Sequence, residues 1–316
     1  IALAARIFGT DAILYGSQAT WSDLMRRPTE PHRSVSLAGA MFGLALMFPC
    51  YFVLANSVGR SSELSMEHQF VVRAIITAAI FGGIPALISM LGRVSWSTGF
   101  GIRKTSLLDL VGAAILGVSL WPAAHEIALL CQEYGFLALN PEIVRKVDVI
   151  VKQFQAMPLW LILATFALVP AVFEELCFRG FLFGAFRQRF SRTWTVVATA
   201  LLFGFFHEVL FPGKLIPTTL LGLVLGWVRL RTGSILPGIV LHALLDGFVL
   251  SIIYYRDELV ARGWGVQEES HLPLAWHGAA LVGIAVGIAL LIATTRATST
   301  DASESSSSDL AANRYW

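Results

Sequence analysis

The sequence has few charged residues for its length. Asp, Glu, Lys and Arg make up 14% of the 316 residues, and 56% of the residues are hydrophobic. Soluble proteins carry about 25% charged residues. A soluble fold of this size exposes too much surface for so few charges, so the composition excludes a soluble globular protein and a disordered chain. The formal net charge of +2 is too small to indicate nucleic acid or another acidic partner.

Cysteines are also scarce, and several catalytic motifs are missing. Cys50, Cys131 and Cys177 lie in or beside apolar runs without the spacing of a metal site. They therefore predict neither a disulfide framework nor a zinc cluster. No GxSxG, GxxxxGK[ST] or paired-cysteine motif occurs, which excludes serine hydrolases, P-loop ATPases and most redox proteins.

Long apolar runs are abundant. A helix of about 20 apolar residues spans the hydrocarbon core of a bilayer. Helices are expected because lipid cannot hydrogen-bond to open backbone groups, and no alternation typical of a membrane barrel occurs. We therefore predict an all-α, polytopic membrane helical bundle of about eight transmembrane helices. The runs cover residues 35–56, 70–92, 106–131, 158–184, 194–211, 214–231, 234–254 and 275–295.

Lys and Arg in the connections predict the orientation of the chain. The connections on one side carry twelve of these residues, and those on the other side carry eight, mostly in longer loops with acidic residues. The excess predicts that both termini lie in the cytoplasm. We expect a multi-pass protein of the cell (inner) membrane.

The first residues differ from the apolar middle of the chain. Residues 1–34 alternate between amphipathic and polar stretches, which predicts a cytoplasmic surface segment and linker. They faintly resemble the tail of an ABC-type permease subunit, which would suit a fusion or an association with such a permease. The residues before the first span lack the pattern of a signal peptide, and a start at Ile1 would suit a fragment of a longer protein.

The rest of the chain divides into four parts. Residues 35–154 are expected to form accessory transmembrane helices, and residues 155–255 a four-helix core. Residues 256–295 contain a loop and the last transmembrane helix. Residues 296–316 include a serine-rich stretch of low complexity and predict a disordered tail.

Ionisable residues interrupt the apolar runs of the second half. A charge at the bilayer centre costs about 2.5–3.5 kcal/mol on insertion scales, so such residues indicate a functional site. Three runs contain them: Glu174, Glu175 and Arg179 in the fourth, His207 in the fifth, and His242 and Asp246 in the seventh.

The two glutamates differ in what lies one turn further along the helix. Glu175 has Arg179 at i+4, in the order that lets the two charges neutralise each other, and we interpret this pair as structural. Glu174 is rotated by about 100° and has no local cation, so it needs a partner on another helix or must be protonated. Pro170 predicts a kink just before the acids, which would make room for water or substrate.

His242 and Asp246 are also separated by four residues, so both point the same way from one helix. Taken alone, the pair could be a hydrogen bond that joins helices. His207 lies about one helical hairpin before His242, and Glu174 about one hairpin before His207. Two histidines with a carboxylate can form a three-ligand zinc site with an open position for water. We therefore expect a divalent metal ion, zinc by preference, held by His207, His242 and Asp246.

Other histidines carry weaker signals. His207 and Glu208 match the start of the zincin motif HExxH, but Phe211 stands where the second histidine is required. His125 and Glu126 have no second histidine nearby and are interpreted as interfacial. The remaining histidines are expected in loops or at helix ends, exposed to solvent: His32, His68, His271 and His277.

The order of the motifs resembles that of the CPBP intramembrane protease family, which includes the type II CAAX prenyl endopeptidases and bacteriocin-processing relatives. The resemblance covers about residues 155–255 and rests on three motifs in order. They stand here as Glu174-Glu175-x-x-x-Arg179, Phe203-x-x-x-His207 and His242-x-x-x-Asp246.

The resemblance implies a role for each motif residue. Glu174 would activate water. Arg179 would hold Glu175 in place, and this pair would support the site. Prenyl-protein proteases of the family usually carry Asn at the last position, so Asp246 puts a CAAX-type substrate in doubt and makes a cation easier to hold. The other motif residues would complete the site as metal ligands or water-holding groups: His207, His242 and Asp246.

The leading hypothesis is a membrane-embedded metalloendopeptidase that cleaves a peptide or protein substrate near the membrane. An ion- or proton-coupled transporter is an alternative, because Glu, His and Asp in membrane helices also form proton relays. No inverted repeat supports that alternative. A non-catalytic immunity or scaffold protein of the same fold is a third hypothesis, since a complete motif does not prove turnover.

Overall fold

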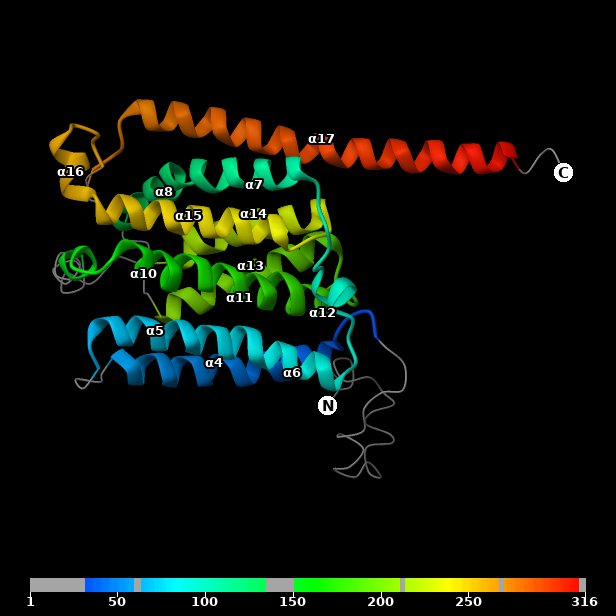
Figure 1. Cartoon of the computed structure of the whole chain (residues 1–316), viewed down its shortest axis with the longest axis horizontal. Helices are drawn as coiled ribbons and strands as arrows, with labels where there is room; N and C mark the ends of the chain where they lie inside the picture. The colour runs from blue at the N-terminus through cyan, green and yellow to red at the C-terminus, as the bar shows by residue number, and fades with distance from the viewer. Residues whose placement is uncertain (1–31, 60–63, 135–150, 211–213, 267–269, 313–316) are drawn as a thin grey trace, which may run out of the picture.

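The computed structural model describes residues 32–59, 64–134, 151–210, 214–266 and 270–312. These residues are helical apart from turns, connections and an isolated bridge between His32 and Val94. Figure 1 shows the helices packed side by side along a common direction. The predicted all-α membrane bundle is confirmed. The predicted segment 1–34 lies almost entirely outside the described residues.

Six helical stretches among the described residues are long and apolar enough to cross a membrane. They occupy six of the predicted runs. The fifth and sixth runs form helices α13 (Arg192–Leu210) and α14 (Leu215–Thr232), which are not among these six. A multi-pass membrane protein is therefore confirmed, and the count of eight spans stays a prediction. The six spans are Leu37–Gly59, Met66–Leu91, Leu107–Glu133, Leu159–Phe186, Leu236–Tyr254 and Leu274–Thr294.

The first half of the bundle forms three of these spans. A capping box begins α7, because Ser106 and Asp109 exchange side-chain and backbone hydrogen bonds. Asp109 also accepts a hydrogen bond of 2.7 Å from the Thr294 hydroxyl, which fixes α7 to the last span. The elements are α4 (Leu37–Gly59), α5 (Met66–Thr77), η1 (Ala78–Gly83), α6 (Ile84–Leu91), η2 (Trp96–Phe100), α7 (Leu107–Ser119) and α8 (Trp121–Glu133).

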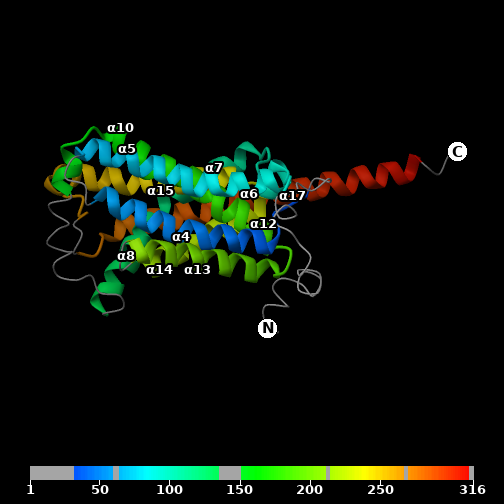
Figure 2. The ribbon, with the colours of Figure 1, turned by 90° about the horizontal axis from the view of Figure 1, so that it is seen from below.

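The second half contains the predicted core. Gly233 ends α14 in the left-handed conformation, which glycine adopts without strain, and the chain turns there toward α15. Figure 2 shows α13 and α14 side by side along one face of the bundle. The elements are α10 (Leu159–Leu163), η3 (Ala164–Leu168), α11 (Val169–Glu175), η4 (Leu176–Leu182), α12 (Phe183–Phe186), α13, α14, α15 (Leu236–Tyr254), α16 (Arg256–Ala261) and α17 (Leu274–Ala312).

Aromatic packing joins the accessory helices to this core. Phe81 of η1, Phe178 of η4 and Phe206 of α13 are buried in one cluster. A second cluster places Leu116 of α7 against Leu241 of α15. The two clusters hold η4, α13 and α15 at fixed positions around the predicted site.

The C-terminal helix differs from its prediction. Residues 296–312, predicted to be disordered, continue α17 as far as Ala312. The helix projects past the other helices in Figure 1. A formed span already provides the nucleus for a helix, so adding residues to its end requires no new nucleation.

Candidate active site

Glu174 and Glu175 lie where the helix changes its winding. The π-helical segment η3 precedes α11, and the π-helical segment η4 begins directly after Glu175. Such segments inside helices are frequent at functional sites. Pro170 lies in the first turn of α11, where its missing N–H is tolerated. At Pro170, where the sequence predicts a kink, the helix changes from π to α winding.

Glu175 and Arg179 form the ion pair that their spacing predicts. Arg179 Nη1 donates to Glu175 Oε1 at 2.7 Å, and both side chains are fully buried. Arg179 Nη2 donates to the Gly222 carbonyl of α14 at 3.1 Å. The guanidinium carbon also lies 4.5 Å from the ring centroid of Phe203 on α13, at cation–π distance. One buried cation thus joins three helices.

The far side of Glu175 contacts α15. A Cβ atom on Gly238 would lie 2.9 Å from Glu175 Oε2, so only glycine allows this approach of α15 without displacing the carboxylate. One turn along α15, His242 Nδ1 lies 3.3 Å from Glu175 Oε1. Glu175 therefore connects Arg179 to His242.

His207 enters the site from α13 in a defined orientation. Its Nδ1 lies 2.9 Å from the Phe203 carbonyl oxygen, which can only accept a hydrogen bond. This contact assigns the proton to Nδ1 and leaves the lone pair on Nε2. Nε2 lies 3.8 Å from Glu174 Oε2. His207 therefore offers a hydrogen-bond acceptor on the side that faces Glu174.

His242 enters from α15 and faces carboxylates at both ring nitrogens. Nδ1 faces Glu175, and Nε2 lies 3.2 Å from Asp246 Oδ2 and 4.0 Å from Glu174 Oε2. An imidazolium, which donates from both nitrogens, suits this arrangement best. Asp246 is the most exposed member of the group, with 31% of its side chain accessible, against 2% for His242.

Glu174 is left with an unpaired oxygen at the centre of the site. Its Oε2 is buried and has no hydrogen-bond partner in the part of the chain that the structure describes. The two histidine nitrogens that face it, at 3.8 and 4.0 Å, are too distant for direct hydrogen bonds. Polar groups at such separations are commonly bridged by water. The structure thus brings all six predicted residues together and leaves Glu174 Oε2 without a direct hydrogen bond among the described residues.

The donors as placed do not fit a three-ligand zinc site. Ligand atoms around one tetrahedral zinc ion lie about 3.3 Å apart, given metal bonds of about 2.0 Å. His242 Nε2 and Asp246 Oδ2, which are 3.2 Å apart, meet this spacing, but His207 forms no ion pair with Asp246 among the described residues. No group of three or more His, Cys, Asp and Glu side chains in the described ranges could hold a metal ion. The zinc ion stays a prediction from the sequence.

The glutamates of two further sequence motifs, Glu208 and Glu126, make contacts that stabilise the fold. Glu208 Oε2 accepts a hydrogen bond of 2.8 Å from the Leu215 backbone N–H and thereby caps α14, which explains its place after His207. Glu126 of α8 contacts both His271 and His277, which the sequence predicts to be solvated. The separation of 145 residues between Glu126 and His271 gave no local signal of this contact.

The structural roles of two glycines in the site were not predicted from the sequence. Gly222 supplies the carbonyl that holds Arg179, and Gly238 permits the contact between α15 and Glu175. A glycine in an apolar run carries no chemical signal of its own. Only the assembled helices show why these two positions require a small residue.

A comparison with known families gives a match over this core. Residues 156–248 match the family model described as type II CAAX prenyl endopeptidase Rce1-like. This segment of the chain is similar to the Rce1-like family. The match confirms the predicted family resemblance and contains all six motif residues. Comparisons with curated proteins and with solved structures gave no match.

The Rce1-like segment supports a membrane protease, that is, a peptide hydrolase embedded in a multi-pass membrane protein. The elements from α4 to α8 and helix α17 lie outside the matched residues. These outer elements pack on the core without contributing any of the six predicted residues.

Proposed function

We propose that this protein is an intramembrane endopeptidase in which Glu174 activates the attacking water. The observation that carries the proposal is the unpaired Oε2 of Glu174, which is buried and lies within 4.0 Å of the Nε2 atoms of His207 and His242. A water molecule between Glu174 and His207 would donate one hydrogen bond to each. Both side chains are suited to accept, because Nε2 of His207 carries a lone pair.

Peptide cleavage then follows as general acid–base catalysis. The water gives a proton to the Glu174 carboxylate while its oxygen attacks the carbonyl carbon of the scissile bond. The carbonyl becomes a tetrahedral oxyanion. Glu174 returns the proton to the amide nitrogen as the carbon–nitrogen bond breaks, which releases an amine and a carboxylic acid.

His242 is placed to stabilise the oxyanion. Its Nε2 lies 3.2 Å from Asp246 Oδ2 and 4.0 Å from Glu174 Oε2, so the oxyanion would share the Nε2–H with Asp246 on the side where the tetrahedral intermediate forms. A fixed donor in a site that excludes most water stabilises developing negative charge effectively. Glu175 and Arg179 position His242 from behind and do not touch the reacting atoms in this proposal.

The substrate is a peptide or protein whose scissile bond reaches the membrane. The open side of the site is formed by His207 and Asp246, with 22% and 31% of their side chains accessible, so the substrate approaches there. Asp246 would repel a substrate carboxylate, and a CAAX substrate ends in one after the residues to be removed. We therefore favour an internal peptide bond over a prenylated C-terminal motif.

We also infer the membrane in which the enzyme lies, its orientation and a partner. The arginine excess supports a cell (inner) membrane location with both chain ends in the cytoplasm. The faint resemblance of residues 1–34 to a permease tail supports an ABC-type permease as a partner or fused neighbour. Co-purification of a tagged chain with a permease would test this partner.

The decisive experiment compares Glu174→Gln with Asp257→Asn, in purified protein and a peptide library in detergent. Asp257 is a matched acid-to-amide control on α16, with 70% of its side chain exposed. We expect Glu174→Gln to lower cleavage by about 10²–10⁴-fold, the usual contribution of a general base. Asp257→Asn should cleave normally. Cleavage by Glu174→Gln at the wild-type rate would contradict the proposal.

A chelator arm tests the predicted zinc ion in the same assay. Water held by Glu174 and His207 alone requires no metal, so activity should persist after chelation. Metal content is measured on the same sample. Loss of activity that Zn²⁺ restores, together with a measured stoichiometry near one, would show that the donors rearrange around an ion and would overturn the metal-free water site.

A further inference from the structure

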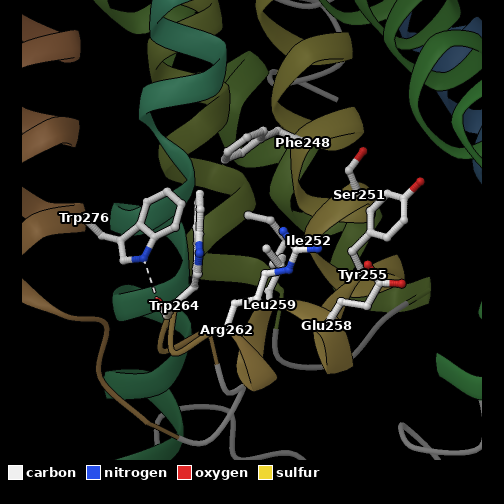
Figure 3. A pocket seen from close by; sticks show the side chains of 9 residues that line it. All are labelled: Phe248, Ser251, Ile252, Tyr255, Glu258, Leu259, Arg262, Trp264 and Trp276. Carbon is white, nitrogen blue, oxygen red and sulfur yellow. Dashed lines mark hydrogen bonds between the residues drawn. The ribbon is translucent and has the colours of Figure 1, made fainter.

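A cavity of about 280 Å³ lies outside the proposed active site, at the end of the bundle where α16 connects α15 to the last span. Figure 3 shows this cavity from close by. Its apolar wall includes Phe248 and Ile252 of α15 and Leu259 of α16. None of the six motif residues lines it.

The cavity lies at the level where a membrane meets water. The span Leu236–Tyr254 ends on one side of it, and the span Leu274–Thr294 begins on the other. Trp264 and Trp276 line it, with a hydrogen bond of 3.0 Å from Trp276 Nε1 to the Trp264 carbonyl. Tryptophan is enriched at this depth, beside lipid headgroups.

Two opposite charges stand at the mouth of the cavity. Glu258 and Arg262 are separated by four residues with the acid first, the order that favours an ion pair. They form no such pair with each other within the described part of the chain, although both are exposed. In Figure 3, Glu258 lies beside Tyr255, and Arg262 extends along Ile252 and Leu259.

The neighbouring pair on the same helix behaves differently. Arg256 Nε lies 3.4 Å from Asp257 Oδ1, so these two charges neutralise each other. Glu258 and Arg262 instead leave one carboxylate and one guanidinium available to a ligand. A ligand that satisfies both must carry a negative and a positive group close together.

A second cavity adjoins the first along α15, on the apolar outer surface of the bundle. A second cavity of about 400 Å³ shares Phe248 and Ser251 with the first and is lined almost entirely by apolar residues, among them Leu163 and Leu244. Together they offer an apolar path that starts at a charged mouth. Ligand pockets of proteins occupy about 300–1,000 Å³, so the joined space is large enough for a chain.

We propose that the two cavities bind a zwitterionic phospholipid of the phosphatidylethanolamine type. Its phosphate contacts Arg262, its ammonium group contacts Glu258, and one acyl chain lies along Phe248 and Ile252 toward the second cavity. Arg262 suits the phosphate because a guanidinium offers two parallel donors. The tryptophans cover the glycerol region of the lipid. This proposal does not depend on the proposed protease activity.

The test is native mass spectrometry of the purified protein with defined lipids added in detergent. We expect wild-type protein to retain phosphatidylethanolamine in preference to phosphatidylglycerol, which lacks the ammonium group. Glu258→Gln should remove that preference, because it removes the anion that binds the ammonium. Arg262→Gln should weaken retention of both lipids by about tenfold, as expected for loss of a charge-assisted hydrogen bond.

Matched controls are Asp257→Asn and Arg256→Gln, which lie on or at the start of the same helix and should leave lipid retention unchanged. The swapped variant Glu258→Arg with Arg262→Glu should restore the preference for phosphatidylethanolamine and guards against misfolding of either single variant. Equal retention of the two lipids by the wild-type protein would overturn the proposal. So would a Glu258→Gln variant with normal lipid retention and an altered KM for peptide, since the cavity would then serve the substrate.

Discussion

Two clusters of histidine and glutamate in this protein use the same residue types in different ways. In the core, Glu174 keeps one buried oxygen without a partner between His207 and His242. Where α8 meets the segment before α17, both oxygens of Glu126 are occupied. Oε2 lies 2.6 Å from His271 Nδ1, and Oε1 accepts from the Leu272 N–H at 2.9 Å and lies 3.3 Å from His277 Nε2.

The comparison shows that chemistry depends on what remains unsatisfied. A glutamate with every lone pair occupied holds parts of the chain together, as Glu126 holds α8 to the segment before α17. A shielded glutamate can accept a proton from water where its free oxygen faces the two histidines, as that of Glu174 does. The Oε2 of Glu175 is also unpaired among the described residues, but it faces Gly238. Residue type alone would give both clusters the same role, and burial with hydrogen-bond accounting separates them.

The sharpest difference should appear on removal of one histidine from each cluster. We expect His207→Gln to lower peptide cleavage by about 10²–10⁴-fold, because the water loses the acceptor that orients it. His277→Gln should leave cleavage near the wild-type rate. Both are measured as kcat/KM on one cleavable peptide in detergent. Equal losses in the two variants would erase the distinction between the clusters.

Local spacing made part of this site predictable. Glu175 with Arg179, and His242 with Asp246, are each one helical turn apart, and both contacts are present. Separations of about one helical hairpin suggested that Glu174 and His207 join this site, and the family resemblance added their roles. The sequence could not show that Arg179 also holds the Gly222 carbonyl, because that contact joins residues 43 positions apart.

The fold was predictable to a similar extent, and for similar reasons. Apolar runs of membrane length located every long helix, since lipid leaves the backbone no other choice. The π-helical segments around Glu174 could not be located, because their winding follows from packing between helices. The contact between His271 and Glu126 was not predicted from the sequence, because the two residues lie in different helical hairpins.

Stability should separate the clusters as strongly as activity does. Arg179→Met removes the guanidinium from the buried Glu175 carboxylate and leaves it only the His242 ring at 3.3 Å. Breaking a buried ion pair costs about 3–5 kcal/mol in comparable cases. Glu126→Gln, at the more exposed cluster, should cost much less. Thermal unfolding in detergent measures both, with folded yield as a second readout. If Arg179→Met unfolds at the wild-type temperature, the ion pair does not carry the structural role assigned to it.

The smallest expected effect is a dependence on pH at the exposed cluster. Hydrogen bonding to Glu126 raises the pKa of His271 above its ordinary value, and Glu133 adds to this effect. The charged imidazole is thus bound more favourably in the folded protein. Its stabilising contribution is complete below about pH 6.5, the ordinary pKa of histidine. The contribution is lost as the pH rises through the raised pKa.

The unfolding temperature should therefore fall slightly as the pH rises from about 6.5, and His271→Gln should remove that slope. His68→Gln serves as the control, because His68 lies at the start of α5 and contacts the Ser65 hydroxyl and, among the described residues, no carboxylate. The groups that face His271 are Glu126 and Glu133, and His277 shares Glu126 with it. Because His271 is exposed, screening by salt should flatten the slope as well. A slope that persists in His271→Gln would have to arise elsewhere, and His271 would then contribute no charged contact that holds the segment before α17 to α8.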